Sequence, residues 1–432
     1  MSVNLKAGAS KIDITPPENM ALAGFRARHG ISVGIHDRLY SSVLILDDGT
    51  EKFLLICNDL IGLDSEFASE LKNLIAAEIK IPSGSIMLTC THTHSGPLTV
   101  NASYGRKNEF YLSFLKGKIL KAVRNAVSSL KEAFLFSDSI KIKNVGKNRR
   151  MPDSGPIDPI LGIIKIKQKN NKLLAVLANY CCHPTVLGPD NLLISADYPG
   201  AFRDKLKERF GSDTVIMFTN GACGDINPGH SAELSALGGR IPGRTFKRAS
   251  ELGKILAEAA IEIISGNSNE YASLSVKSKK INLFLKNFPP VEEIKSAIAE
   301  NKAALSGKRG KELIAAQVEL LHSELLLDKA VERNVIEKDH LIFEIQAVKI
   351  SENTVLLGMP AELFVDIGLT IKKMSPFKNT FIIGYANGYM SYIPTGQACL
   401  EGGYEVLVSK FIPESSEEII MESLNILNEI FV

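Results

Sequence analysis

Short apolar runs, separated by polar stretches rich in glycine, proline or aspartate, recur along most of the chain. Residues 42–46 and 53–57 are two such runs around an Asp-Asp-Gly turn at 47–49, which is typical of two strands joined by a tight connection. Further runs of this kind predict strands at residues 10–17, 86–88, 139–145, 161–166, 173–177, 214–219, 271–285, 341–350, 355–357 and 380–383.

Longer segments with helical periodicity lie between these strands. They predict helices at about residues 64–79, 109–133, 198–210, 245–265 and 415–430. Glu362 is expected to open a further helix that runs to about residue 374. Because the connections between strands vary in length, neither a regular barrel nor a purely doubly wound sheet is expected. The predicted fold is α/β, with layered mixed β-sheets covered by helices.

Residues 288–336 differ in character from the rest of the chain. Two prolines are followed by two charged helical runs, 291–305 and 311–333, with a glycine-containing break between them. This pattern predicts a helical hairpin inserted into the surrounding domain. No repeat, low-complexity tract or flexible linker interrupts the remainder, so we expect a single domain over residues 1–432.

Composition narrows the class of protein. The chain is 45% hydrophobic and 23% charged, and its net charge of +2 is too small to indicate a nucleic-acid or membrane partner. No secretion signal is recognised at the start, and the six cysteines show no disulfide-framework spacing. We therefore expect a cytoplasmic protein with reduced thiols, no stable membrane association and a small-molecule substrate. The oligomeric state stays open.

Candidate chemistry lies in polar loops that follow four of the apolar runs. These loops carry His92 and His94, His183, Asp225 and Asn227, and Tyr389 and Tyr392. In α/β proteins, loops at strand ends commonly carry catalytic and ligand residues. Whether the four loops meet in space does not follow from their composition.

The pair His92 and His94 stands at the end of one predicted strand. Residues two apart point to the same side if the backbone stays extended, so the two imidazoles could share a metal ion. Taken alone, a His-X-His segment is more often an ordinary surface or hydrogen-bonded pair. The rest of the chain favours the metal site.

Several motifs, in order along nearly the whole chain, resemble the neutral (non-lysosomal) ceramidase family of zinc amidases. They are THTHSGP at 91–97, Arg150 before Met-Pro, His-Pro-Thr at 183–185, Gly-Asp-Ile-Asn-Pro at 224–228, Glu362, and the tyrosines around Tyr392 and Tyr404. The resemblance implies a ceramidase-like catalytic domain. It also implies that zinc is held by His92, His183, Glu362 and Tyr392. A metal-bound hydroxide would then attack an amide carbonyl.

The resemblance also implies roles around the metal. His94 is the expected acid or base, and Arg150 and Tyr404 are expected to hold the carbonyl or the developing oxyanion. Asp197 and Asp225 either orient ligand histidines or serve as ordinary cap and turn residues. Both interpretations stay open at this point.

Three features depart from the family. Asn227 stands where ceramidases carry serine, and an amide cannot be an acylated nucleophile, although it can still donate a hydrogen bond. Ceramidases are longer, with an additional β-sandwich domain, and work at membranes. This chain has no tryptophan and 7% aromatic residues, which indicates a weak grip on lipid. The substrate is therefore expected to have changed.

The leading hypothesis is a zinc-dependent hydrolase that cleaves an N-acyl bond in a small, soluble molecule. A true ceramidase or other lipid amidase is one alternative, and an ester or lactone hydrolase on the same metal is another. A non-catalytic binding protein with a degenerate site is the third.

Overall fold

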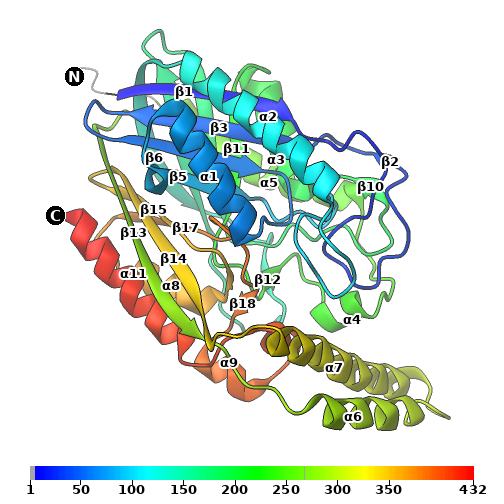
Figure 1. Cartoon of the computed structure of the whole chain (residues 1–432). Coiled ribbons are helices and arrows are strands. Elements are labelled where there is room, and N and C mark those ends of the chain that lie inside the picture. Colours follow the sequence, from blue (N-terminus) through cyan, green and yellow to red (C-terminus); the bar gives the residue numbers. More distant parts are fainter. Residues whose placement is uncertain (1–4, 267) are drawn as a thin grey trace.

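Two mixed β-sheets lie face to face in the computed structural model, which describes residues 5–266 and 268–432 (Figure 1). The strands of the larger sheet are, in spatial order, β11 (Val215–Asn220), β9 (Leu173–Tyr180), β8 (Ile160–Gln168), β6 (Lys131–Lys141), β1 (Leu5–Asp13), β3 (Tyr40–Asp47), β4 (Lys52–Asn58) and β5 (Ile86–Cys90). Only the outer pairs, β11–β9 and β4–β5, are parallel.

The smaller sheet consists of β13 (Ala272–Phe284), β14 (His340–Ser351), β15 (Thr354–Gly358) and β17 (Asn379–Ile383). Its β15–β17 pair is parallel, and apolar side chains such as Met87, Ile164, Leu356 and Phe381 fill the space between the two sheets. Gly162 allows close contact there, because a Cβ at this position would lie 2.3 Å from the Phe381 ring. The two sheets therefore share one mainly apolar interface.

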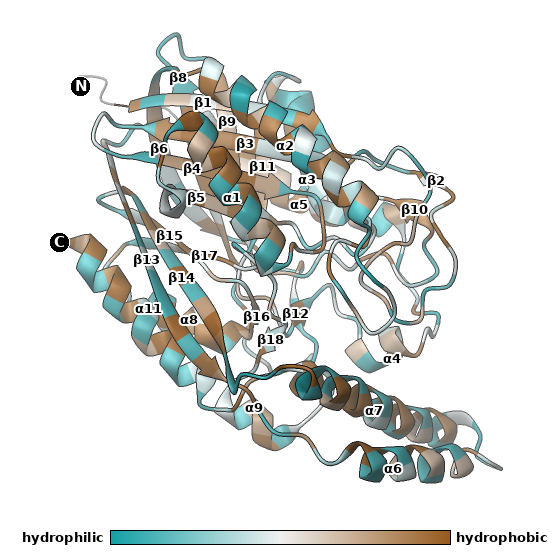
Figure 2. Ribbon diagram, in the orientation of Figure 1, coloured by the Kyte–Doolittle hydropathy of each residue, from teal (hydrophilic) through white to brown (hydrophobic). Residues whose placement is uncertain are grey.

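Helices cover the outer face of each sheet. On the larger sheet they are α1 (Ser65–Ile79), α2 (Glu109–Ser128), α3 (Asp197–Phe210) and α5 (Phe246–Ser265), and on the smaller sheet α8 (Val365–Met374) and α11 (Ser415–Phe431). Figure 2 shows both hydrophobic and hydrophilic stretches on α1, α2 and α11, as expected of helices with one buried face. The predicted layered α/β fold is confirmed as helix, sheet, sheet and helix layers.

A helical hairpin follows β13 and precedes β14. It consists of α6 (Val291–Ala303) and α7 (Gly310–Asn334), and it extends away from the sheets (Figure 1). Near the end of α7, Glu332 accepts hydrogen bonds from Lys329 at 2.7 Å and Lys410 at 2.6 Å. Burial alone would raise the pKa of the Glu332 carboxyl group. The two nearby ammonium groups have the larger effect and lower this pKa to about 2. The base of the hairpin is thereby held to the domain.

The remaining elements are short. They are the strand pairs β2 (Gly34–Ile35) with β10 (Leu193–Ile194), β7 (Lys147–Asn148) with β12 (Ile226–Asn227) and β16 (Glu362–Leu363) with β18 (Tyr392–Ile393), the 3-10 turn Ser83–Ser85, and the helices α4 (Ala232–Ala236), α9 (Gly396–Glu401) and α10 (Tyr404–Val408). Within residues 5–266 and 268–432, no helix is both long and apolar enough to cross a bilayer.

Several predicted boundaries are wrong. The strand expected at residues 10–17 is β1, which spans Leu5–Asp13 and ends before the two prolines. The helix expected to reach residue 133 ends at Ser128, and β6 begins at Lys131 instead of residue 139. Here pairing with β8 overrides the helical pattern of the sequence. Glu362 does not open a helix; it lies in β16, and α8 begins three residues later at Val365.

The carboxyl ends of the three parallel pairs meet in one region. The side-chain amide of Asn220, at the end of β11, donates to the carbonyl of Thr91, just after β5, at 2.5 Å. Gly384, just after β17, donates its N–H to the Asn220 carbonyl at 2.9 Å and accepts from Thr89 Oγ1 at 3.0 Å. The loops that follow these strands are consequently fixed beside one another.

A buried ion pair supports this region. Asp59 directly follows β4, and its Oδ2 accepts hydrogen bonds from Arg203 Nη1 at 2.5 Å and from the Tyr40 N–H at 2.8 Å. Burial raises the pKa of Asp59, and Arg203 opposes that shift by stabilising the charged carboxylate. Removing either partner would strand a charge in the interior.

We expect Arg203→Met to lower the free energy of unfolding by about 3–5 kcal/mol, because the Asp59 carboxylate loses its buried counter-charge. Urea denaturation followed by circular dichroism measures this change. Arg209→Met, an exposed position on the same helix, is the matched control and should change stability by less than about 0.5 kcal/mol. Equal losses in the two variants would contradict a structural role for the ion pair.

Candidate functional site

His92 is delivered by the loop after β5. Its φ of 64° lies in the left-handed region, so the extended backbone expected for this segment is wrong: the strand ends at Cys90. The His92 N–H donates to the Leu60 carbonyl at 2.8 Å, and its Nδ1 lies 2.6 Å from the Ile61 carbonyl. Its ring stacks on Tyr385 with centroids 4.0 Å apart. The surrounding structure holds His92 in an otherwise unfavourable conformation, as is common at functional sites.

His183 is held in a similar way by the loop after β9. Its Nδ1 lies 2.5 Å from the Cys223 carbonyl, and its backbone N–H donates to the Ile226 carbonyl at 2.9 Å. A carbonyl only accepts, so Nδ1 carries a proton in both His92 and His183. The Nε2 atom of each ring is thereby directed to the interior of the site.

Glu362 and Tyr392 are neighbours because β16 and β18 pair in parallel with these two residues in register. Glu362 Oε2 lies 2.8 Å from His183 Nε2 and 3.6 Å from His92 Nε2. The other oxygen, Oε1, accepts a hydrogen bond from the Tyr389 hydroxyl at 2.5 Å. His92, His183 and Glu362 are therefore brought to one place, and Tyr392 lies beside Glu362 in the strand pair.

The protonation states of this group reflect strong mutual contacts. Burial raises the pKa of Glu362, but His92 and His183 outweigh it, and the pKa falls to about 2. Burial lowers the pKa of His183, but its contacts with Cys223 and Glu362 raise it to about 10. For His92, burial prevails and lowers the pKa to about 4. The site thus combines a buried carboxylate with an acceptor nitrogen on His92.

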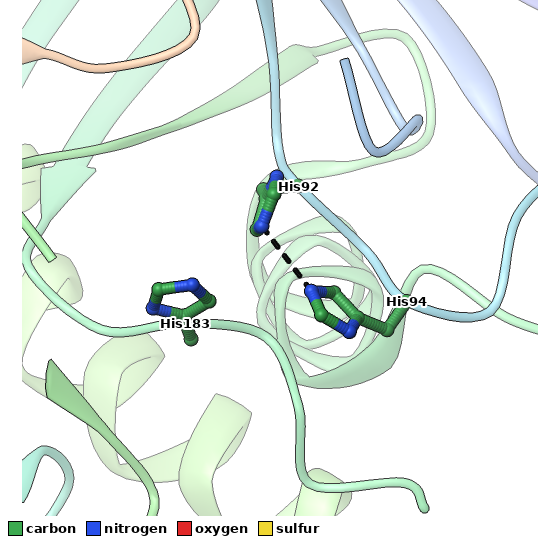
Figure 3. A group of neighbouring side chains, drawn as sticks. All are labelled: His92, His94 and His183. Atoms are coloured by element: carbon green, nitrogen blue, oxygen red, sulfur yellow. Dashed lines mark hydrogen bonds between the residues drawn. The ribbon is translucent and has the colours of Figure 1, made fainter. Parts of the chain in front are cut away.

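The donor set fits a metal ion such as zinc. Ligand nitrogens of His92, His94 and His183 all lie within 4.8 Å of one another, and Figure 3 shows the three imidazoles turned toward a common space. Imidazole nitrogens and a carboxylate are normal zinc ligands, and here the Nδ1 atoms of His92 and His183 are held by backbone carbonyls. Two ligand sets are open: the three histidines, or His92 and His183 with Glu362, to which Tyr392 is the neighbour in the β16–β18 pair.

His94 lies beside this group. Its Nε2 is 3.2 Å from His92 Nε2, while its Nδ1 is buried without a hydrogen-bond partner among the described residues. Burial, followed by the nearby His92 and His183, lowers the pKa of His94 well below its usual value. Gly24 packs against the ring, and a Cβ there would lie 2.3 Å from it. His94 is therefore a neutral imidazole in a close-fitting slot.

A cavity opens next to His94. It is lined by Gly24, Phe25, Arg26, His94, Arg149, Thr185, Asn227, Ala232, Ser235, Ala236, Arg244, Tyr392 and Tyr404. His94, Asn227, Tyr392 and Tyr404 were expected at the site, and all four line the cavity.

Arg150 does not line the cavity; its neighbour Arg149 does. The Arg150 guanidinium instead contacts Glu405 at 3.2 Å and Glu401 at 3.4 Å. Arg149 donates to the Tyr392 hydroxyl at 3.2 Å and pairs with Glu405 at 2.6 Å. The role expected of Arg150 therefore fits Arg149 better. The reason is local register: the Arg149 N–H bonds to the Asp225 carbonyl and turns its side chain inward.

The side-chain amide of Asn227 forms most of its hydrogen bonds within a turn. Its Oδ1 accepts from the N–H groups of Gly229 at 2.8 Å and His230 at 2.9 Å, and its Nδ2 donates to the His230 carbonyl at 2.7 Å. One N–H of the amide remains for another acceptor. The side chain thus shapes the cavity wall.

Asp225 and Asp197 do not contact the histidine rings. Asp225 accepts from the Val365 N–H at 2.8 Å and from Asn148 Nδ2 at 2.9 Å, and Asp197 accepts from the Leu187 N–H at 3.0 Å. Of the two interpretations left open by the sequence, these contacts favour the cap and turn roles.

Sequence reasoning did not identify Arg149, Tyr385 or Glu405 as members of the site, and it gave Tyr389 no specific contact. Arg149 and Tyr385 lie within segments that the sequence had singled out, next to Arg150 and to Tyr389 and Tyr392. Glu405 directly follows Tyr404. Proximity to these motifs was the only available signal, because the contacts depend on long-range register.

Comparison with known proteins places this geometry in a family. Residues 5–239 match the sequence model of the neutral/alkaline non-lysosomal ceramidase N-terminal domain. The neutral ceramidase of Pseudomonas aeruginosa is 23% identical over 92% of this chain and 68% of its own length. Neutral ceramidase B of Dictyostelium discoideum is 25% identical over 45% of this chain and 30% of its own.

Solved structures show the same fold. The crystal structure of neutral ceramidase from Pseudomonas aeruginosa superposes with a TM-score of 0.80 at 20% identity, covering 100% of this chain and 75% of that one. A structure described as ceramidase complexed with C2 gives a TM-score of 0.75 at 19% identity, with coverage of 99% and 75%. The chain belongs to the neutral/alkaline non-lysosomal ceramidase family.

Proposed function

We propose that the protein is a zinc-dependent amidohydrolase that cleaves an N-acyl bond. The observation that carries this proposal is the convergence of His92 Nε2, His183 Nε2 and Glu362 on one buried point. Amide hydrolysis is supported by membership in the ceramidase family. A bound zinc ion would supply Lewis-acid chemistry, polarising the amide carbonyl and lowering the pKa of a water molecule.

In this proposal His92, His183, Glu362 and Tyr392 hold the metal. The carbonyls of Ile61 and Cys223 keep the two imidazoles in the tautomer that presents Nε2. Tyr389 holds Glu362 through Oε1, which leaves Oε2 for the ion. Arg149 donates to the Tyr392 hydroxyl and stabilises negative charge on that oxygen.

His94 is the proton carrier of the proposal. It is neutral at physiological pH, because burial holds its pKa well below the usual value, and so it can accept a proton. Its Nε2 lies 3.2 Å from His92 Nε2, so His94 would be close to a water molecule held at this site. After taking a proton there, His94 can deliver it to the departing amide nitrogen.

Tyr404 is the donor to the amide oxygen. Tyr404 lines the cavity, and its hydroxyl has no hydrogen-bond partner among residues 5–266 and 268–432. Burial raises the pKa of this phenol, so its proton stays in place at neutral pH. Asn227 provides no hydroxyl for an acyl-enzyme, and direct attack by water is therefore the route compatible with this chain.

We expect His183→Ala to remove bound zinc and to lower hydrolysis of N-acyl amides by more than about 100-fold, since even residues that only orient metal ligands cost 10–100-fold. Elemental analysis of purified protein and release of fatty acid from N-octanoyl amides and from ceramide in detergent measure the two effects. His340→Ala, remote from the site, is the control. Zinc content equal to wild type in His183→Ala would refute the assignment.

Tyr389→Phe tests the orientation of Glu362. Loss of its hydroxyl frees the Oε1 atom, and we expect zinc affinity to fall by about 10–100-fold. Chelator competition measures the affinity, and Tyr271→Phe, an exposed position, is the matched control. An unchanged affinity would show that Tyr389 does not position the carboxylate.

Tyr404→Phe tests the oxyanion donor. We expect kcat to fall by about 10²–10³-fold, as for loss of one such donor elsewhere, while zinc content stays at the wild-type level. Steady-state kinetics with metal analysis on the same preparation measure both. A wild-type kcat in this variant would remove Tyr404 from the mechanism.

A further inference from the structure

The residues that line the cavity beside His94 carry more positive than negative charge. Its lining includes three arginines, Arg26, Arg149 and Arg244, and no aspartate or glutamate. Each guanidinium is a permanent cation at neutral pH and needs compensation when it is withdrawn from water. The partners of the three side chains therefore indicate which positive charge is left for a ligand.

Two of the three arginines are neutralised by the protein. Arg26 pairs with Asp328 and, at 3.3 Å, with Glu324, both on α7. Arg149 pairs with the buried carboxylate of Glu405 at 2.6 Å. These two side chains carry little uncompensated charge into the cavity.

Arg244 has no such partner. Its Nη2 donates to the Ser235 hydroxyl at 2.5 Å, while Nε and Nη1 are buried and make no hydrogen bond. No carboxylate of residues 5–266 and 268–432 lies within the 4.0 Å of a salt bridge; Asp190 and Asp197 attract it only from farther away. Burial lowers the pKa of Arg244 to about 10, so it is still charged at neutral pH.

Arg28 adds a second cation that forms no salt bridge with a described residue, although Asp190 attracts it from farther away. It donates to the carbonyls of Ala23 at 2.5 Å and Gly188 at 3.3 Å, and its Nε is buried without a partner. Arg28 and Arg244 both lie over the Phe25 ring, 5.0 and 5.3 Å from its centroid. Two like charges gathered on one ring repel each other unless an anion joins them.

The same ring connects these charges to the catalytic group. Phe25 packs edge-on against His94, with centroids 4.9 Å apart. Arg244 and His94 are thus both in contact with one phenyl ring and both line the same cavity. If Arg244 binds an anionic group of a substrate whose amide reacts beside His94, that group and the amide must be close together in the substrate molecule.

We infer that Arg244, supported by Arg28, binds a carboxylate of the substrate, so that the cavity selects N-acyl compounds with an anionic group close to the scissile amide. This inference rests on the proposed amide hydrolysis and specifies its substrate class. A guanidinium whose Nε and Nη1 atoms make no hydrogen bond can donate to a carboxylate oxygen and matches the carboxylate in charge.

The carboxylate has two chemical sources, and substrate pairs distinguish them. N-hexanoylglycine carries it on the amine side, with N-hexanoylglycinamide as its neutral match. N-hexylsuccinamic acid carries it on the acyl side, with N-hexylsuccinamide as its match. We expect the acid of one pair to exceed its neutral match in kcat/KM by about 10–100-fold, the value of one charge-assisted hydrogen-bonded contact.

Arg244→Gln in the zinc-loaded full chain tests the residue. We expect the acid-to-neutral ratio of kcat/KM to fall to about 1, mainly through a rise in KM for the acid. Arg244→Lys, which keeps the charge, should retain part of the preference and guards against misfolding of the glutamine variant. Arg248→Gln, which changes a half-buried arginine paired with Glu251 outside the cavity, should keep the wild-type ratio.

The outcomes separate this inference from the proposed function. Equal rates of hydrolysis for the acid and the neutral amide of both substrate pairs would contradict the selection for an anion. The proposed amide hydrolysis would still hold. A preference that survives in Arg244→Gln would overturn the assignment to Arg244. No hydrolysis of any of these amides, nor of ceramide in detergent, by zinc-loaded protein would overturn the proposed function itself.

Discussion

Two hydrogen bonds between imidazole Nδ1 atoms and backbone carbonyls underlie the whole site. The carbonyl of Ile61 holds His92 and that of Cys223 holds His183, so each ring keeps one tautomer and one orientation. Both carbonyls belong to loops that follow strands of parallel pairs, β4 and β11. The chemistry at Nε2 therefore depends on how the edges of the larger sheet are connected to the second sheet through Asn220 and Gly384.

Much of this arrangement could be predicted from local sequence, and the remainder could not for a definite reason. Apolar runs ending in polar loops predicted the layered α/β fold, and the loops with His92 and His183 do meet. The neighbouring positions of Glu362 and Tyr392 come from a two-residue strand pair formed by segments 30 residues apart. Neither the choice of Arg149 over Arg150 nor the β-structure at Glu362 has a local signal, because both are decided by pairing partners distant in sequence.

Asn227 replaces the serine of the family pattern, and its side chain is part of a closed turn in the cavity wall. Its amide closes the turn at Gly229 and His230, a set of contacts that a serine hydroxyl could make only in part. The same loop leads through Ser231 into α4, which supplies Ser235 to the cavity wall. Asn227 therefore lies in the same segment of chain as Ser235, which accepts the hydrogen bond from Arg244.

Arg26 gives the inserted hairpin a direct electrical influence on the cavity. Its guanidinium belongs to the cavity lining, while its counter-ions Glu324 and Asp328 belong to α7. If α7 moved away from the domain, the carboxylates of Glu324 and Asp328 would move with it. Arg26 would then join Arg28 and Arg244 as an arginine without a salt bridge near the cavity. Because α7 carries both counter-ions of Arg26, the net charge of the cavity wall depends on where the inserted hairpin lies.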